Sequence, residues 1–387
     1  MSLHNKILYL LNFLLIILTQ NFIQAQNIIK IKIFSGINVN TAIFKVNAGK
    51  YAIINSKDTI CKILPGEHVT FSINNEKIRI EKNKHTAGIF NEILIIGLSF
   101  RNSFQIIPDN NKNLQRTYDN NLVIKKNNAD LLLINYVDLE NYVAGVVEAE
   151  TGGISDNEEF FKVQAIISRT YAVGHLNNHK EEGYNLCDGV HCQSYKGQAS
   201  KNVILKAVYA TQGSVLADSN YKLITAAYHS NSGGLTVGSG DLWNKQLPYL
   251  ISINDTFSIN GSQAKWEIKM KKQYWLDFLD KEFHFPTDDS TAVAFALNFT
   301  QDSTRNIYFY KNITLKSIRE KLGLRSTWFS VIDSGDDIII KGKGYGHGVG
   351  LSQEGAAIMA ASGYSYDEIL KFYYKGVQII KKDKLKF

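Results

Sequence analysis

The residues VDLENYVAGVVEAE, at positions 137–150, decide how the middle of this chain folds. Apolar side chains recur in them at the spacing i, i+3, i+4, i+7 and i+8, which is the spacing of one face of an α-helix. We therefore predict a helix that begins near Asp138 and buries that face. The apolar residues on it are Leu139, Tyr142, Val143, Val146 and Val147.

The next position on the same face is Glu150. A carboxylate that ends an apolar face is either part of a fraying helix end or a placed acid. Burial among apolar groups raises the pKa of a carboxyl group, which makes it a usable general acid near neutral pH. Glu148 points to the opposite side of the helix together with Glu140, so the same pattern leaves it out. Glu150 is therefore the candidate catalytic residue.

Length and composition bound the class of protein. A chain of 387 residues can bury a large core and is long enough for two or more domains. A hydrophobic content of 44% and only four prolines exclude a largely disordered chain. The net charge of +7 is spread along the sequence and is compatible with an acidic polymer. No nucleic-acid motif accompanies that charge, so we expect no nucleic-acid partner.

The N-terminus has the layout of a secretory signal peptide. Lys6 precedes the apolar run 7–18, and Ala25 stands before a plausible cleavage point. The alternative is a membrane anchor, but the run is shorter than the ~20 apolar residues that a spanning helix needs. We predict that residues 1–25 are a cleaved signal peptide. The mature protein is then exported to the periplasm or cell-wall space, with no stable membrane span.

The rest of the chain indicates an α+β fold. Residues 26–115 read as short alternating strands separated by turns rich in Asn, Lys and Gly, and we expect a β-rich N-terminal region there. Residues 116–387 read as a mixed α+β domain. Two capping boxes, Ser155 with Glu158 and Ser365 with Glu368, predict helix starts within it.

Two glycine-containing segments are candidate ligand-binding loops. The sequence YHSNSGG at 228–234 places polar side chains after a strand, although an ordinary turn would look the same. The sequence GKGYGHGVGLSQ at 342–353 has a glycine at every second position, and it fits neither a Walker loop nor a dinucleotide-binding pattern. Alternating glycines leave one face of a strand bare, so that a flat polymer or another backbone can approach it closely.

Three cysteines are present, and two of them lie close together in sequence. Cys187, His191 and Cys192 can supply three ligands to a tetrahedral zinc ion, and His179 is available as the fourth. The competing interpretation is a disulfide between Cys187 and Cys192, which is natural in an exported protein. The residues alone leave both interpretations open.

From about Arg116 to the C-terminus, these segments in this order resemble the SpoIID/LytB family, the stage II sporulation protein D type of peptidoglycan enzyme. The resemblance is carried by the 137–150 block and by further blocks in a fixed order. They are KVQAIISRTYA at 162–172, CDGVHCQ at 187–193, HSNSGG at 229–234, LGLRSTW at 322–328 and GYGHGVGLSQ at 344–353.

The resemblance implies a lytic transglycosylase that cleaves peptidoglycan glycan strands stripped of their stem peptides, with Glu150 as the single general acid/base. It also implies a zinc ion held by His179, Cys187, His191 and Cys192, with His175 as an alternative to His179. Because four protein ligands leave no open position for water, we expect this ion to be structural. The residues it implies around the glycan groove, for support or binding, are Lys162, Gln164, Arg169, Tyr171, His229, Ser230, Ser232, Gly233, His347, Ser352 and Gln353. Within this group we expect Lys162 and Arg169 to bind or neutralise the carboxylates of muramic acid.

The chain departs from the family pattern after the glutamate. The family usually has Met-Pro at this point, whereas this sequence has Thr151-Gly-Gly, so we expect a looser backbone there. The main alternative function is a glycan-binding protein that stimulates a cell-wall amidase, which needs the groove but not Glu150. A zinc hydrolase ranks lower, because no H-E-x-x-H or similar helix is present.

Overall fold

The computed structural model describes residues 27–56, 58–243, 245–301 and 305–386. The predicted signal peptide lies outside these residues. The fold is mixed α+β with a β-rich N-terminal region, as the sequence indicated. The chain divides into two compact units, which are described separately below. The first contains the chain up to Gly152 together with 171–212, and the second contains 153–170 and 213–387.

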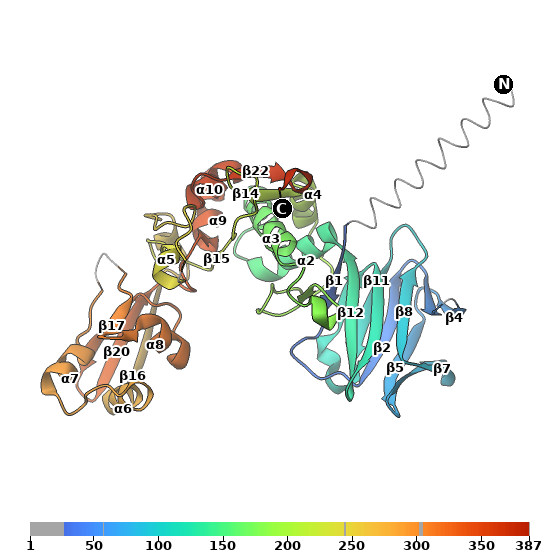
Figure 1. The fold of residues 1–387 in the computed structure, drawn as a ribbon, viewed down its shortest axis with the longest axis horizontal. Helices are drawn as coiled ribbons and strands as arrows, with labels where there is room; N and C mark the ends of the chain where they lie inside the picture. The colour runs from blue at the N-terminus through green and yellow to red at the C-terminus, as the bar shows by residue number, and fades with distance from the viewer. Residues whose placement is uncertain (1–26, 57, 244, 302–304, 387) are drawn as a thin grey trace, which may run out of the picture. The chain divides into compact units, whose positions relative to one another are not determined.

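The first unit is built on two β-sheets (Figure 1). In spatial order, the seven-stranded sheet consists of β13 (Leu186–Cys187), β1 (Ile28–Lys32), β12 (Asp130–Asp138), β11 (Asn121–Asn127), β8 (Glu92–Gly97), β3 (Tyr51–Asn55) and β4 (Asp58–Ile63). The six-stranded sheet consists of β10 (Arg116–Asp119), β9 (Ser103–Pro108), β2 (Thr41–Ala48), β5 (His68–Asn74), β6 (Lys77–Lys82) and β7 (His85–Phe90), with the 3₁₀ helix η1 (Asp109–Leu114) after β9.

Alternating side chains bury one face of each sheet against the other. Phe44 of the six-stranded sheet and Tyr51 of the seven-stranded sheet are both fully buried, and their rings meet edge to face at 5.2 Å. Phe104 stacks on Phe44 at 4.8 Å and lies 5.8 Å from Tyr118. Such aromatic pairs add stabilisation beyond the area they bury. The core between the sheets is therefore held by a chain of aromatic rings.

Helix α2 (Leu139–Thr151) extends this aromatic core. Tyr195 lies 5.9 Å from Tyr118 on one side and 5.0 Å from Tyr142 of α2 on the other. The other elements of this unit are α4 (Asn202–Ala210), which contacts α2, and the short η2 (Lys180–Glu182). Helix α3 (Glu158–Gly174) starts in the second unit, and only its last turn, from Tyr171, belongs to the first.

The two units divide the chain differently from the ranges expected from sequence. We expected one region at 26–115 and another at 116–387. Instead β11 pairs with β8 and β12 pairs with β1, so these later strands complete a sheet begun by the N-terminal region. Strand propensity does not reveal which strands pair across such distances in sequence.

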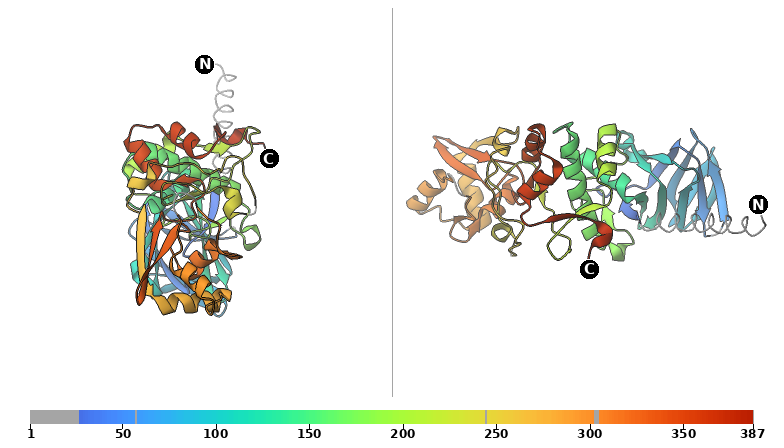
Figure 2. Two further views of the ribbon diagram at one scale, coloured as in Figure 1. Left: turned by 90° about the vertical axis from the view of Figure 1, so that its left-hand side faces the viewer. Right: turned by 90° about the horizontal axis from the view of Figure 1, so that it is seen from above.

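The second unit contains a lobe formed by 265–343, around a three-stranded sheet (Figures 1 and 2). Its strands are, in order, β16 (Lys265–Lys271), β20 (Asp337–Lys343) and β19 (Phe329–Ser334), and its helices are α6 (Lys272–Phe283), α7 (Ser290–Leu297) and α8 (Leu315–Leu322). A hairpin of β17 (Tyr308–Tyr310) and β18 (Ile313–Thr314) joins them. The lobe has its own aromatic core, which includes Trp275, Phe299 and Phe309.

The remainder of the second unit brings distant segments together in short pairings. β14 (Ser214–Ala217) pairs antiparallel with β22 (Gln378–Lys381), and β15 (Tyr228–His229) pairs parallel with β21 (Leu351–Ser352). The helical segments here are α5 (Ser239–Leu242), η3 (Ser258–Asn260), α9 (Gln353–Ala361), α10 (Tyr366–Tyr373) and η4 (Lys382–Lys384).

One of the two predicted capping boxes forms. Ser365 and Glu368 cap each other's backbone groups at the start of α10, as predicted. The prediction for Ser155 and Glu158 is wrong, because α3 begins only at Glu158. There the side chain of Asn157 accepts the backbone N–H of Glu159 at 2.8 Å instead, and Ser155 accepts that of Asn157 at 3.1 Å. Both residues are good capping groups, and the sequence does not say which is used.

In the part of the chain that the structure describes, no helix combines the length and the apolar character that crossing a membrane requires.

The packing of α2 generates the first prediction. A Cβ added to Gly145 would lie 2.1 Å from the carbonyl oxygen of Gly197 and 2.6 Å from the ring of Tyr195. Although Ala favours a helix over Gly by about 1 kcal/mol, this clash dominates. We expect Gly145→Ala to lower the free energy of unfolding by about 2 kcal/mol, measured by urea denaturation. Exposed Gly36 has no atom near such a Cβ, so Gly36→Ala is the control. Equal stability of the two variants would contradict this packing.

Candidate functional site

Helix α2 places Glu150 in its last turn. Asp138 caps the N-terminus by accepting the backbone N–H of Glu140 at 2.9 Å, and the predicted apolar face is buried. Glu150 itself is only partly buried, in contrast to the deeper position that the apolar face indicated. The helix ends at Gly152, whose φ of 47° is left-handed and favours glycine. The last residue of the helix is thus Thr151, one residue after the candidate acid.

The carboxylate of Glu150 is oriented by a backbone hydrogen bond. Its Oε1 accepts the N–H of Ser194 at 2.7 Å. Ser194 lies between Gln193, which accepts a long hydrogen bond of 3.5 Å from the Tyr142 hydroxyl, and Tyr195, whose ring packs on Tyr142. The segment that holds Glu150 is thus itself anchored on α2, the helix that carries Glu150.

Glu148 has a structural role. Its carboxylate accepts the backbone N–H of Ser200 at 2.7 Å, the Ser200 hydroxyl at 2.6 Å and the backbone N–H of Lys201 at 3.1 Å. These groups belong to the two residues that precede α4. The neighbouring glutamate is therefore occupied in joining α2 to α4, which agrees with its exclusion on sequence grounds.

The four predicted metal ligands come together in the first unit. The ligand atoms of His179, Cys187, His191 and Cys192 all lie within 4.8 Å of one another. Cys192 Sγ lies 3.5 Å from His179 Nε2 and 3.6 Å from His191 Nδ1, and Cys187 Sγ lies 4.0 Å from the same His191 atom. Tetrahedral zinc with ordinary bond lengths requires ligand separations of about 3.3–3.8 Å. The two separations from Cys192 fall in this range and the one from Cys187 to His191 is slightly longer, so the donor set fits zinc with a small contraction of the cluster.

Groups around this cluster orient its ligands. Glu182 accepts a hydrogen bond from His179 Nδ1 at 2.5 Å, so Nε2 of that ring is available as a metal ligand. Glu182 also accepts a hydrogen bond from the Tyr184 hydroxyl at 2.5 Å. A carboxylate behind a ligating histidine is the usual outer partner of a metal site. The backbone N–H of Cys187 also points to Cys192 Sγ, at 3.3 Å.

The structure shows neither the Cys187–Cys192 disulfide nor His175 in place of His179. Cys187 and Cys192 are free thiols rather than a disulfide. Burial raises the pKa of the Cys192 thiol above its usual value. His175 is outside the four-ligand cluster, with its ring stacked on Tyr171 at 4.0 Å and Nδ1 bonded to the Tyr171 carbonyl at 2.7 Å.

The residues predicted on α3 lie largely inside the protein. Lys162 is paired with Glu158 at 2.9 Å and Glu159 at 2.8 Å. Gln164 is fully buried, as is Arg169, which donates to the carbonyl of Ser214 at 3.0 Å. The expectation that Lys162 and Arg169 bind substrate carboxylates does not fit this geometry, because one is neutralised by two glutamates and the other is out of contact with solvent.

Tyr171, the last residue of the predicted support block, is partly exposed. Burial raises the pKa of its hydroxyl to about 12. The group therefore stays protonated over the physiological range and is available as a hydrogen-bond donor.

The two predicted loops of the second unit lie side by side, but most of their side chains face inward. Ser232 is fully buried and donates to Asp255 at 2.7 Å, and Asn231 donates to Glu354 at 2.6 Å. Sequence reasoning missed Asp255 and Glu354, the buried carboxylates that hold this turn. The predicted binding residues that are buried here are His229, Ser232, Gly233, Ser352 and Gln353, whereas Ser230 and His347 are partly exposed.

The alternating glycines allow the backbone of the 227–233 segment to pack closely against them. The four glycines from 344 to 350 all have positive φ, so the segment beyond β20 is not a strand as predicted. A Cβ on Gly344 would lie 2.6 Å from the Asn231 carbonyl oxygen, and one on Gly350 would lie 2.1 Å from that of Ala227. Of the two interpretations of the glycine pattern, the structure supports the close packing of chain segments.

Two histidines of these loops form a neutral pair. The rings of His229 and His347 have centroids 5.5 Å apart, and both bond to the backbone of Val349. Burial lowers the pKa of His229 well below its usual value and lowers that of His347 to about 4. Neither ring carries a charge at neutral pH.

This pair predicts a pH dependence of stability. Because the pKa of His347 is lower in the folded than in the unfolded chain, its contribution is complete above about pH 6.5 and is lost as the pH falls toward 4. The loss is about 3 kcal/mol at most. We expect His347→Gln to reduce the difference in unfolding free energy between pH 7 and pH 4.5. His68→Gln, at an exposed position, is the control. An unchanged pH dependence in His347→Gln would contradict the neutral state of His347 in the folded protein.

Comparison with known proteins places the chain in a family. The family model described as SpoIID, stage II sporulation protein, matches residues 127–217. Stage II sporulation protein D of Bacillus subtilis (strain 168) is 31% identical over 268 residues, covering 65% of this chain and 76% of that protein. The amidase enhancer of the same organism is 29% identical over 276 residues, covering 57% of this chain and 38% of that protein. An uncharacterized protein of Brachyspira hyodysenteriae is 28% identical over 269 residues, covering 68% and 72%.

The chain therefore belongs to the SpoIID/LytB family. The matched range 127–217 contains α2 with Glu150, the whole of α3 and the four-ligand cluster. Membership of this family supports a function related to the cell wall.

Proposed function

We propose that this protein is a peptidoglycan lytic transglycosylase that cleaves denuded glycan strands with Glu150 as its single general acid/base. The observation that carries the proposal is the setting of Glu150. It is a partly exposed carboxylate at the end of a firmly packed helix, and one of its oxygens is held by the Ser194 N–H at 2.7 Å. The nearby Glu148 is engaged with Ser200 and Lys201, the two residues before α4, so it is not available as a second catalytic carboxylate.

One carboxylate is sufficient for this reaction. Protonated Glu150 gives its proton to the glycosidic oxygen between muramic acid and glucosamine as the bond to C1 breaks. The resulting carboxylate takes the proton of the muramic acid C6 hydroxyl, whose oxygen closes on C1 to form the 1,6-anhydro ring. The proton is returned to Glu150 and no water is consumed. A hydrolytic glycosidase, in contrast, ordinarily needs a pair of carboxylates.

The proposal predicts a sharp difference between two glutamates on one helix. Glu150→Gln keeps the shape of the side chain but cannot release or accept the proton, so we expect turnover of denuded glycan to fall by about 10²–10⁴-fold. Glu148→Gln is the matched control. It should keep activity within about twofold and cost about 1 kcal/mol of stability, because the hydrogen bonds to Ser200 and Lys201 become weaker. Full activity of Glu150→Gln would assign the catalytic role elsewhere.

A second candidate is stimulation of a cell-wall amidase, which is favoured by the likeness to the Bacillus subtilis amidase enhancer. This role needs glycan binding but no proton transfer. The Glu150→Gln variant separates the two functions. An enhancer keeps its effect on a purified amidase in that variant, whereas a transglycosylase loses release of anhydro products.

We also propose that the first unit holds a structural zinc ion through His179, Cys187, His191 and Cys192. Four protein ligands leave no open position for water, so the ion would support the fold rather than the chemistry. Its contribution to function would be indirect, because Cys192 stands two residues before Ser194, whose N–H orients Glu150. Export to the periplasm or cell-wall space, through the N-terminal signal, belongs to the same proposal.

Removal of the metal tests this part of the proposal. Metal analysis of the reduced, purified protein should find about one zinc per chain. Cys192→Ser should lose the metal and unfold at lower temperature, and Cys61→Ser, which changes the cysteine outside the cluster, should keep both properties. A zinc-free protein in which Cys187 and Cys192 are joined by a disulfide would overturn the proposal.

A further inference from the structure

Asp188 directly follows the proposed metal ligand Cys187 and has no role in the account so far. Its side chain is almost completely buried, with 4% of its surface exposed. Its backbone joins two elements, because its N–H donates to the Lys32 carbonyl of β1 at 3.0 Å and its carbonyl accepts the N–H of Tyr195 at 3.1 Å. A buried carboxylate is costly unless it is paired. The partners of this side chain therefore show what the residue holds in place.

Four donors surround the Asp188 carboxylate, and they come from both sheets of the first unit. Oδ2 accepts the backbone N–H of Phe34 at 2.7 Å and Nη1 of Arg116 at 2.8 Å. Oδ1 accepts the backbone N–H of Ser35 at 2.9 Å and its hydroxyl at 2.5 Å. Phe34 and Ser35 follow β1 of the seven-stranded sheet, and Arg116 begins β10 of the six-stranded sheet. The β-rich region thus binds a carboxylate of the proposed metal-ligand segment.

The backbone at Phe34 adopts an unusual conformation in this site. Its φ of 58° is left-handed, which is uncommon for residues other than glycine and costly for a bulky side chain. Here two successive N–H groups, those of Phe34 and Ser35, bind one carboxylate, which is the arrangement of an anion-binding nest. The Arg116 guanidinium lies over the Phe34 ring, 4.9 Å from its centroid. Arg116 therefore supports the strained turn and pairs with the anion that the turn holds.

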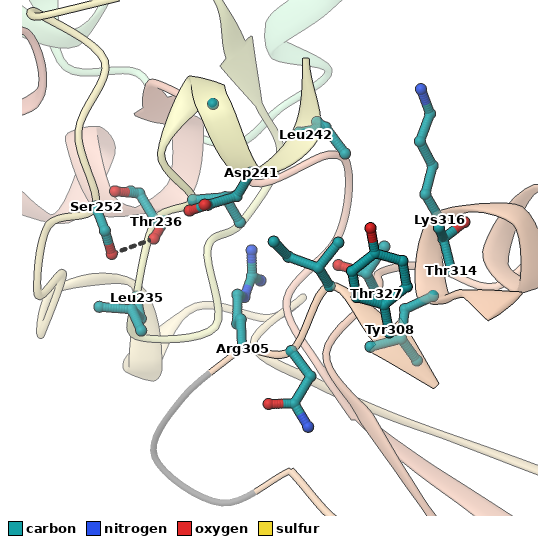
Figure 3. A pocket seen from close by; sticks show the side chains of 15 residues that line it. Leu235, Thr236, Asp241, Leu242, Ser252, Arg305, Tyr308, Thr314, Lys316 and Thr327 are labelled. Atoms are coloured by element: carbon teal, nitrogen blue, oxygen red, sulfur yellow. Dashed lines mark hydrogen bonds between the residues drawn. The ribbon is translucent and has the colours of Figure 1, made fainter. Parts of the chain in front are cut away.

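Arg116 contacts both an aromatic ring and a carboxylate. Arg305 gives a comparison: it lines a cavity of the second unit (Figure 3), lies over the Trp328 ring at 5.0 Å and donates Nη2 to the Ser232 carbonyl at 2.9 Å. That carbonyl is a neutral acceptor, whereas Asp188 places a carboxylate against Arg116. Removal of the charge of Asp188 would leave a partly buried guanidinium without this counter-charge, which is costly.

The segment after Asp188 leads to the candidate acid. The hydrogen bond from the Tyr195 N–H to the Asp188 carbonyl closes a loop, and Ser194, directly before Tyr195, donates its N–H to Glu150 at 2.7 Å. Because this donor is a backbone group, it cannot compensate for a displaced loop by a change of rotamer. The direction of the Glu150 carboxylate therefore depends on where Asp188 is held.

We propose that Asp188 is a positioning residue for Glu150, and that the turn at Phe34 and Ser35, together with Arg116, is the anion-binding site that holds it. Through this contact the N-terminal β-rich region sets the geometry of the candidate acid without touching the substrate. The catalytic consequence rests on the proposed function, whereas the position of the Ser194 N–H does not.

The first experiment follows the backbone amide of Ser194 by NMR in the full chain, produced with isotopically labelled serine. Its resonance is assigned by its absence in Ser194→Ala, and Glu150→Gln gives the shift that accompanies a weaker hydrogen bond. We expect Asp188→Asn to move the resonance in the same direction, because Asn presents one acceptor oxygen and no charge to the four donors. Arg116→Lys, which keeps the positive charge, should move it less.

Ile80→Ala is the control for lost stability. Ile80 is fully buried on β6, so its truncation leaves a cavity and lowers the unfolding temperature, but the Ser194 resonance should stay in place. If Asp188→Asn does not fold, Ser35→Ala removes a single donor and should give a smaller shift in the same direction. An unchanged Ser194 resonance in every folded variant of this site, or an equal shift in Ile80→Ala, would overturn the proposal.

Turnover of denuded glycan is the second readout. A displaced acid impairs the chemical step rather than binding of the strand. We therefore expect Asp188→Asn to lower kcat by about 10–10²-fold and to change KM by less than about twofold. Unchanged kcat in a variant whose Ser194 resonance has moved would overturn the catalytic part of the proposal. Absence of turnover in the unsubstituted protein would overturn the proposed function instead, and the resonance would still test the role of Asp188.

Discussion

The hydrogen bond from the Ser194 N–H to the Glu150 carboxylate is the contact on which the candidate site depends. It joins two elements that are far apart in sequence, the end of α2 and the segment that follows the four-ligand cluster. The donor is a backbone group, so its position is set by the path of the chain from Cys192 to Tyr195 rather than by a side-chain rotamer. The candidate metal-binding segment and the candidate acid, which are separate motifs in the sequence, are therefore in direct contact in the structure.

Helix α2 and the segment around Ser194 both pack on the β-sandwich of the first unit. The aromatic rings that fill the sandwich continue through Tyr118 and Tyr195 to Tyr142 on α2. Gly145 allows the segment around Tyr195 to lie directly against the helix. The N-terminal region, which carries no recognisable chemistry of its own, therefore helps to fix the helix that presents the candidate acid Glu150. This is a physical reason for the two regions to share one compact unit.

Features of the site that depend on local sequence spacing could be predicted from sequence, and contacts between residues far apart in the chain could not. Helix α2 and its buried face follow from local spacing, because a helix face is determined by near neighbours. For the segment 179–192 the spacing left a zinc site and a disulfide both open, and the set of four ligands came from the family resemblance. The burial of Arg169 and the turn at 231–232 depend on partners such as Ser214, Asp255 and Glu354, which lie elsewhere in the chain.

The central claim is that Glu150 protonates the glycosidic oxygen and deprotonates the C6 hydroxyl of muramic acid, instead of activating water. Digestion of denuded glycan in water labelled with heavy oxygen, followed by mass spectrometry of the products, tests it most directly. The account predicts muramic acid ends that are lighter than the hydrolysed form by one water molecule and that contain no heavy oxygen. Reducing ends that carry heavy oxygen would contradict it, since they would show that water, and not the C6 hydroxyl, attacks C1.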